Sequence, residues 1–270
     1  LAFYRDRNAR LADCIGAFGL QSNDYSDLGF DFGDREPTTK IALFAHPEFR
    51  DRVKALADMT RARLRAYLVQ ETFFKSNDVK LLVDIGWNAT IQANLMHAFH
   101  NDADFPMLLG YYFHRRYHHD DYLISSRSLL MPGRFFDQKR RVPTEHAIGH
   151  CLELFELAAA APHGATLSYQ EIDGDVKPVL STAGAKLSDK QKILQAGIVE
   201  YAEAFAKSRG DARLDLSVLR AQAVAELARL ILHPTRRQAE SLRELEHALD
   251  WGSQKTRPLI AENMGPFLVL

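Results

Sequence analysis

The chain has 270 residues, of which 46% are hydrophobic and 26% are charged, and its formal net charge is −1. This composition is typical of a folded globular protein and excludes a disordered, collagen-like or low-complexity chain. The balanced charge excludes a whole-chain field that attracts nucleic acid, and no apolar run approaches the roughly 18 residues that span a bilayer.

The cysteines and the N-terminal residues bear on the cellular compartment of the protein and on whether the chain is a piece of a longer one. Cys14 and Cys151 are too few for a disulfide framework, so reduced thiols in a cytoplasmic protein are expected. The first residues, LAFYRDRNAR, carry charge early and are unlike a signal peptide. They also lack an initiator methionine, so we expect a piece of a longer protein.

The first part of the chain, residues 1–77, is expected to be mainly helical. Apolar residues at spacings of three and four predict a helix over residues 2–18. A stretch rich in Gly, Asp and Ser, residues 22–40, predicts a loop. Pro47 then suits the start of a long amphipathic helix that reaches residue 74.

The character of the chain changes at Asp78. Residues 78–87, DVKLLVDIGW, form a short apolar run that predicts a strand buried on both faces. A helix over residues 90–100 and a second apolar run, residues 105–114, follow, as in a parallel βαβ unit. We therefore expect an α/β fold in which a short Rossmann-like parallel sheet is flanked by helices.

The remaining divisions follow from composition. An α/β core over residues 78–183 is expected to precede a mostly helical C-terminal part, residues 184–270. The whole chain, 1–270, is expected to form a single domain.

Local signals place the later elements. Thr144 can cap a helix over residues 146–161, and Asp173-Gly174 predicts a β-hairpin. Capping boxes at Ser188-x-x-Gln191 and Thr235-x-x-Gln238 predict the starts of two C-terminal helices.

The turn after the first strand is the first candidate site. A strand that ends at Asp84 and leads into a helix brings a carboxylate and free backbone amides to the carboxyl edge of the sheet, where ligands bind. A helix N-terminus favours phosphate, and Thr90 and Gln92 can reach the same ligand. The alternative is that Asp84 caps the helix and Trp87 packs. Neither G-x-G-x-x-G nor G-x-x-x-x-G-K is present.

A basic, histidine-rich segment follows the second strand at the same edge. Arg115 and Arg116 suit a diphosphate, because the guanidinium fork makes paired, charge-assisted hydrogen bonds. The neighbouring histidines and aspartates either hold a metal or form a solvated loop. They are His114, His118, His119, Asp120 and Asp121. For His118 and His119 we favour the solvated loop.

Three further places in the chain carry residues that could do chemistry. His146 and His150 share one helix face, as zinc requires, but Ala147 replaces the glutamate of H-E-x-x-H, so a surface pair is favoured. Glu156 lies in an apolar stretch, where a buried carboxylate acts as a base, binds substrate hydroxyls or pairs with an arginine. His163 either reaches the same site or caps the helix.

Three ordered blocks resemble a bacterial surface-polysaccharide domain that is often fused to a haloacid-dehalogenase-type phosphatase. DIGW followed by Thr90-Ile91-Gln92 is similar to its D-I-G-W-x-G-[ST]-x-Q turn. LFELAAAAPHGATLSYQEIDGDVKPV and HPTRRQAESLRELEHALDWG look like its later blocks. The chain departs from the pattern at Ala89, where the family has glycine, and at Gln238-Ala239, where Glu-Ala is expected. The first 77 residues match loosely, and no D-x-D phosphatase motif is present at a strand end.

The resemblance implies a glycan phosphoribosyltransferase. Such enzymes move 5-phosphoribose from phosphoribosyl diphosphate to a growing polysaccharide, as in capsule or O-antigen, and the phosphatase then leaves ribofuranose. The implied catalytic residues are Asp84, Glu156 and His163, with Asp84 also holding Mg²⁺ and Glu156 or His163 activating the acceptor hydroxyl. The implied donor-binding residues are Gly86, Trp87, Asn88, Thr90, Gln92, His114, Arg115 and Arg116.

The expected partners are the phosphoribosyl diphosphate donor, a glycan acceptor and a fused or associated phosphatase of the haloacid-dehalogenase type. No nucleic acid and no transmembrane segment are expected. The expected location is the cytoplasm, with peripheral attachment to the inner membrane as an alternative. The rival functions are a nucleotide-sugar glycosyltransferase and a non-catalytic glycan-binding scaffold. A methyltransferase is disfavoured, because no glycine-rich turn follows LLVDIGW.

Overall fold

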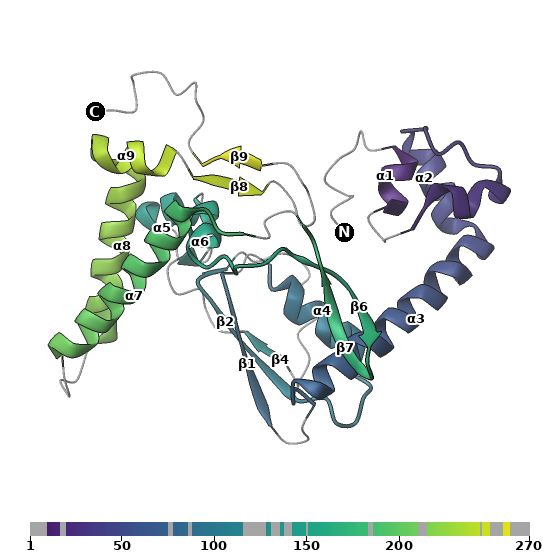
Figure 1. Cartoon of the computed structure of the whole chain (residues 1–270), viewed down its shortest axis with the longest axis horizontal. Coiled ribbons are helices and arrows are strands. Elements are labelled where there is room, and N and C mark those ends of the chain that lie inside the picture. The colour runs from purple at the N-terminus through teal and green to yellow at the C-terminus, as the bar shows by residue number, and fades with distance from the viewer. Residues whose placement is uncertain are drawn as a thin grey trace. The chain divides into compact units, whose positions relative to one another are not determined.

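The computed structural model is a mixed α/β protein (Figure 1). It describes residues 10–16, 20–74, 78–85, 88–115, 128–130, 136–137, 142–149, 151–182, 186–209, 215–243, 245–248 and 256–259. The chain divides into two compact units, Leu1–Arg65 and Ala66–Leu270. Whether the predicted three parts make one functional domain stays a prediction. None of the helices in the described ranges is both long and apolar enough to span a membrane.

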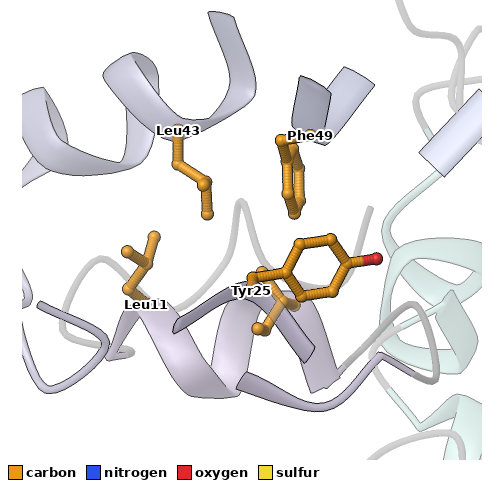
Figure 2. Close-up of a cluster of buried hydrophobic side chains, with 5 residues drawn as sticks. Leu11, Tyr25, Leu43 and Phe49 are labelled. Atoms are coloured by element: carbon orange, nitrogen blue, oxygen red, sulfur yellow. The ribbon is translucent and has the colours of Figure 1, made fainter. Parts of the chain in front are cut away.

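The first unit is built from short helices around a small apolar core. The helices are α1 (Leu11–Gly16), the 3-10 helix η2 (Ser22–Leu28), α2 (Pro37–Ala45) and the start of α3 (Pro47–Gln70). Figure 2 shows the buried side chains of Leu11, Tyr25, Leu43 and Phe49 gathered together. The rings of Tyr25 and Phe49 meet edge to face, with centroids 5.1 Å apart.

The predicted loop over residues 22–40 is wrong in two places, because it contains η2 and the start of α2. Pro37 supplies the fixed φ of a helix start, and the apolar residues that follow it give α2 a buried side, at Leu43. The predicted first helix is seen only as α1, and its flanks, residues 2–9 and 17–18, lie outside the described residues.

The long helix α3 begins at Pro47, as predicted, and ends at Gln70. Its end is a Schellman motif, in which the Phe73 amide donates to the Leu68 carbonyl and the Thr72 amide donates to the Val69 carbonyl. Thr72 accordingly has a φ of 58°, in the left-handed region.

The second unit contains a parallel sheet. Strand β1 (Val79–Asp84), helix α4 (Thr90–Phe99) and strand β2 (Met107–Tyr112) form the predicted βαβ unit, with β1 and β2 parallel. Strand β4 (Ser128–Leu130) pairs with β2 on its other side, so the order of this sheet is β1-β2-β4. A second parallel pair joins β3 (His114–Arg115) to β5 (Phe136–Asp137).

The prediction that β1 is buried on both faces is wrong. In the described sheet β1 lies at an edge, and the side chains of Val79, Leu81 and Val83 are 57%, 55% and 64% exposed. Alternate residues of β1 are less exposed, which is the pattern of a strand covered on one face. By contrast, β2 buries Leu108 and Tyr112.

The predicted hairpin is confirmed as β6 (Thr166–Ile172) and β7 (Asp175–Leu180), which pair antiparallel. Asp173 and Gly174 have φ values of 56° and 83°, as a two-residue hairpin turn requires. The hairpin is anchored to the end of α3. The Gln70 side-chain amide donates to the Val176 carbonyl over 3.1 Å and accepts from the Val176 amide over 2.7 Å.

The predicted helix over residues 146–161 is two helices, α5 (Pro143–Gly149) and α6 (Leu152–Ala158). The break falls at Cys151, whose φ and ψ of −122° and 43° are not helical. Thr144 lies inside α5 instead of capping it, because Pro143 already occupies the start of the helix.

The C-terminal part is mostly helical, as predicted, with α7 (Asp189–Arg209), α8 (Leu216–Leu232) and α9 (Arg236–Arg243). Both capping boxes are confirmed by reciprocal hydrogen bonds, at Ser188 with Gln191 and at Thr235 with Gln238. The sequence reasoning missed a small antiparallel pair, β8 (Glu246–Ala248) and β9 (Thr256–Pro258).

Candidate functional site

The connection between β1 and α4 has the predicted local geometry. Asp84 is the last residue of β1, and Thr90 is the first residue of α4. The side chain of Asp84 is half-buried and Thr90 is exposed. Asn88 has a buried Oδ1 with no hydrogen-bond partner among the described residues. The predicted donor-binding residues Gly86 and Trp87 lie outside the described residues.

Ala89 enters α4 with a φ of 55° and a ψ of 29°. This left-handed conformation is one that glycine adopts freely and that strains a residue with a Cβ. The sequence pattern that this turn resembles has glycine at this position. Ala89 therefore differs from that pattern at a residue whose backbone conformation suits glycine.

The second candidate segment lies directly beside this connection. The Phe113 amide donates to the Asp84 carbonyl over 3.0 Å, and the His114 amide donates to the Ile85 carbonyl over 3.0 Å. These bonds continue the parallel pairing past the end of β1. They bring His114 and Arg115, both at most 6% exposed, next to the start of the connection. Arg116 lies outside the described residues.

Tyr112 lies between the connection that carries Asp84 and the segment that carries Arg115. It pairs in register with Asp84, and its side chain is 1% exposed. Burial raises the pKa of Tyr112, the negative charge of Asp84 raises it further, and the positive charge of Arg115 opposes the shift. Asp84 and Arg115 therefore both act on one phenol at the carboxyl end of neighbouring strands.

Gln92 is placed differently from the expectation. It is 1% exposed, and its Oε1 accepts a hydrogen bond from the Tyr112 hydroxyl over 2.7 Å. Its Nε2 also approaches the Leu108 carbonyl, at 3.4 Å. The amide thus faces strand β2 in the interior, because Gln92 lies on the side of α4 that packs on the sheet. Its predicted contact with a donor stays untested.

His114 is a neutral residue in the interior of this region. Its side chain is 0% exposed, and burial lowers the pKa of His114 to about 4. The His114 ring meets the Phe155 ring of α6 edge to face, with centroids 4.9 Å apart, and the Phe113 ring lies 6.4 Å from the same ring. Helix α6 therefore packs against Phe113 and His114, directly after strand β2.

The expectation that Glu156 is buried is wrong, because the structure exposes its side chain. Glu156 follows Phe155 on α6, so it comes from a helix that contacts His114. The break at Cys151 shortens this helix, whose buried residues are Leu152 and Leu157. An apolar neighbourhood in sequence was therefore a poor guide to the burial of Glu156.

His163 is exposed, and its Nδ1 lies 3.0 Å from the Gly164 carbonyl oxygen. No described contact joins His163 to Asp84 or Arg115. The zinc interpretation of His146 and His150 stays untested, since His150 lies outside the described residues. Across the described ranges no three or more His, Cys, Asp or Glu side chains form a metal-binding group.

A pocket lies elsewhere, between α8 and α9. It has a volume of about 400 Å³ and contains none of the predicted site residues. Its lining residues are Leu230, Thr235, Arg237, Gln238, Ser241 and Leu242. The capping box accounts for Thr235 and Gln238, so this pocket follows from the junction of two helices.

Sequence reasoning missed Tyr112, Gly110 and the ion pair between Glu145 and Arg220. The alternation of β2 carried a signal for the first two, since Gly110 and Tyr112 share the strand face that packs against α4.

No protein-family model matches this chain, and no curated protein shows significant sequence similarity to it.

Proposed function

We propose that this protein is a glycosyltransferase that transfers 5-phosphoribosyl from phosphoribosyl diphosphate to a bacterial polysaccharide acceptor. The observation that carries the proposal is that Asp84 ends β1 in register with Tyr112, while the backbone bonds of Phe113 and His114 hold the segment that carries Arg115 beside the end of β1. Ligands of α/β proteins bind at this edge. The resemblance of the DIGW turn and the two later blocks supports the same reaction class.

The proposed fold is a Rossmann-like sheet, of which β1, β2 and β4 are the described strands. In this setting the free amides at the start of α4 and the exposed hydroxyl of Thr90 bind a phosphate of the donor. The Arg115 guanidinium binds the diphosphate with charge-assisted hydrogen bonds. His114, the neighbour of Arg115 in β3, is buried against Phe155.

The residues at the connection fit a magnesium ion. Asp84 offers one carboxylate, and Asn88 offers a buried amide oxygen at the same connection. Magnesium usually takes one or two protein carboxylates together with substrate phosphates and water. When bound, the ion neutralises charge on the diphosphate leaving group.

The proposed transfer breaks the bond between C1 of the ribose and the diphosphate oxygen. The acceptor hydroxyl oxygen forms the new bond to C1, its proton passes to a base, and the diphosphate leaves with the electron pair of the broken bond. Glu156 is the proposed base, since it is an exposed carboxylate on the helix that contacts His114, next to Arg115. His163 is the alternative base.

A synthetic glycan acceptor incubated with the protein, phosphoribosyl diphosphate and Mg²⁺ tests the reaction by mass spectrometry. The expected product is heavier than the acceptor by one phosphopentose. Asp84→Asn and Arg115→Ala should lower its yield, whereas Asp189→Asn, at an exposed pair with Lys192, should not. Turnover of a nucleotide sugar instead would identify the rival enzyme class. Glycan binding without turnover of either donor would identify a scaffold.

The proposal includes the setting of the reaction. The transferred group carries a 5-phosphate, so a phosphatase of the haloacid-dehalogenase type, fused or associated, is the proposed partner that removes it. The protein is proposed to act in the cytoplasm, freely or at the periphery of the inner membrane.

A further inference from the structure

A hydrogen bond between Gln92 of α4 and Tyr112 of β2 lies next to the connection between β1 and α4, which is proposed to hold the donor. Gln92 lies in the first turn of α4, and Tyr112 is the register partner of Asp84, the last residue of β1. The hydroxyl of Tyr112 donates to Gln92 Oε1 over 2.7 Å, and both side chains are 1% exposed. The two ends of the connection between β1 and α4 are therefore tied to the same residue of β2.

The surrounding backbone is shaped to accommodate this bond. A Cβ on Gly110 would lie 2.1 Å from Gln92 Oε1 and 2.4 Å from Tyr112 Cε2. Only glycine leaves that space, because real Cβ atoms do not approach other atoms so closely. Strand β2 thus lacks a side chain at the one place where the Gln92 amide and the Tyr112 ring need room.

The strand end of the connection also has short backbone contacts with the segment that carries Arg115. Asp84 and Ile85 accept hydrogen bonds from Phe113 and His114, each over 3.0 Å. These bonds fix the first residues of the connection, whereas the start of α4 has its side-chain tie through Gln92. Loss of that tie would release the helix end while leaving the strand end in place.

We propose that Gln92 and Tyr112 are a pair of positioning residues, which hold the N-terminus of α4 at the separation from Arg115 that a diphosphate-sugar donor requires. This inference rests on the proposed function, because it names the residues that preorganise that donor site. In this inference Gln92 supports the donor site without contacting the donor. The amides of α4 and the side chain of Thr90 then contact the donor.

Three variants of the full chain test this role. Tyr112→Phe removes the hydroxyl and keeps the ring, and Gln92→Leu removes the amide at similar volume. Each single change leaves one buried polar partner, which costs stability, while the double variant replaces both partners by apolar groups and should recover much of it. Binding of phosphoribosyl diphosphate with Mg²⁺ is measured by calorimetry, and stability is measured by urea denaturation.

We expect donor binding to weaken by about tenfold to a hundredfold in all three variants, since small displacements of a binding group have effects of that order. In the double variant binding should stay weak although stability recovers. Recovery of affinity together with stability would overturn the inference and make the bond purely structural. Val224→Ala, a buried change in α8, is the matched control and should lower stability without weakening donor binding.

Failure of the proposed function gives a different pattern. If the unmodified protein does not bind phosphoribosyl diphosphate, the proposed function fails, and hydrogen exchange then decides the inference. The amides of residues 88–93 should exchange about tenfold faster in the double variant than in the unmodified protein, while α8 is unchanged. Equal exchange at residues 88–93 would overturn the positioning role.

Discussion

Glu145, near the start of α5, forms an ion pair with Arg220 of α8, which lies 75 residues further along the chain. The Glu145 side chain is 3% exposed, and that of Arg220 is 31% exposed. The pair therefore joins two helices through a carboxylate that water barely reaches. A buried carboxylate is tolerated where a cation neutralises it, so we expect this pair to be important for the docking of α8.

Arg220→Ala should lower the free energy of unfolding by about 3 kcal/mol, because it leaves the carboxylate of Glu145 buried without its cation. This is the low end for a buried pair, since Arg220 is 31% exposed. Arg229→Ala is the control in the same helix. Arg229 pairs with Glu226 at the surface, and the loss there should stay below about 1 kcal/mol. Urea denaturation of the two variants makes the comparison. Equal losses in the free energy of unfolding would show that the buried pair stabilises the protein no more than a surface pair does.

Gly110→Ala should destabilise the protein by about 2 kcal/mol or more, because the new methyl group overlaps Gln92 Oε1 and the Tyr112 ring. Gly197→Ala is the opposite case. Gly197 lies inside α7, and a Cβ there meets nothing within 4 Å, so this change should stabilise α7 by up to about 1 kcal/mol. Thermal unfolding of both variants measures the signs. A tolerated Gly110→Ala would contradict the close approach of α4 to β2.

Ala89→Gly should leave stability unchanged or slightly raised. It relieves a left-handed backbone, which costs a residue with a Cβ about 1–2 kcal/mol, and this gain offsets the extra chain entropy of glycine and the lost methyl burial. Ala93→Gly, in the helical part of α4, should lower the free energy of unfolding by about 1 kcal/mol. Similar losses at both positions in urea denaturation would show that the conformation of Ala89 is not strained.

Local patterns of the sequence were sufficient for much of the fold. The hairpin at Asp173-Gly174 and the capping boxes at Ser188 and Thr235 each depend on residues a few positions apart, and each is confirmed. The order of strand, helix and strand from Val79 to Tyr112 is confirmed for the same reason. Propensity and periodicity act over such short distances, so they can be read from sequence.

Features that depend on distant segments were not predictable in this way. The exposure of Val79, Leu81 and Val83 depends on what covers that face of the sheet, and an apolar run does not contain this information. Glu156 is exposed although its helix buries Leu152 and Leu157, because the elements packed against a helix decide which of its faces is buried. The bond of Gln92 to Tyr112 requires the register of two strands and the packing of α4, which join residues 20 positions apart.

His114 should make the stability of the second unit depend on pH. Burial lowers its folded-state pKa to about 4, whereas an unfolded histidine has a pKa near 6.5. The unfolded chain therefore takes up a proton first as the pH falls. The free energy of unfolding should drop by about 2 kcal/mol between pH 7 and pH 5 and stop changing from this cause below about pH 4.

His114→Gln removes this titration, so the difference in stability between the variant and the unmodified protein should change across that range. The measurement is urea denaturation at a series of pH values. Carboxylates with lowered pKa, such as Asp215, lose their contribution mainly below about pH 4, so they do not mask the histidine. A pH-independent difference would show that His114 keeps an ordinary pKa in the folded protein.

Glu156→Gln should lower turnover of phosphoribosyl diphosphate by about 10²–10⁴-fold, since it removes the proposed base while keeping the shape of the side chain. Because Glu156 is exposed, stability should change by less than about 0.5 kcal/mol, which separates catalysis from folding. Glu153→Gln, on the same helix, is the matched control and should keep near-normal turnover. The assay is phosphopentose transfer followed by mass spectrometry, with thermal unfolding in parallel. Normal turnover of Glu156→Gln would exclude Glu156 as the base and make His163→Gln the next variant to measure.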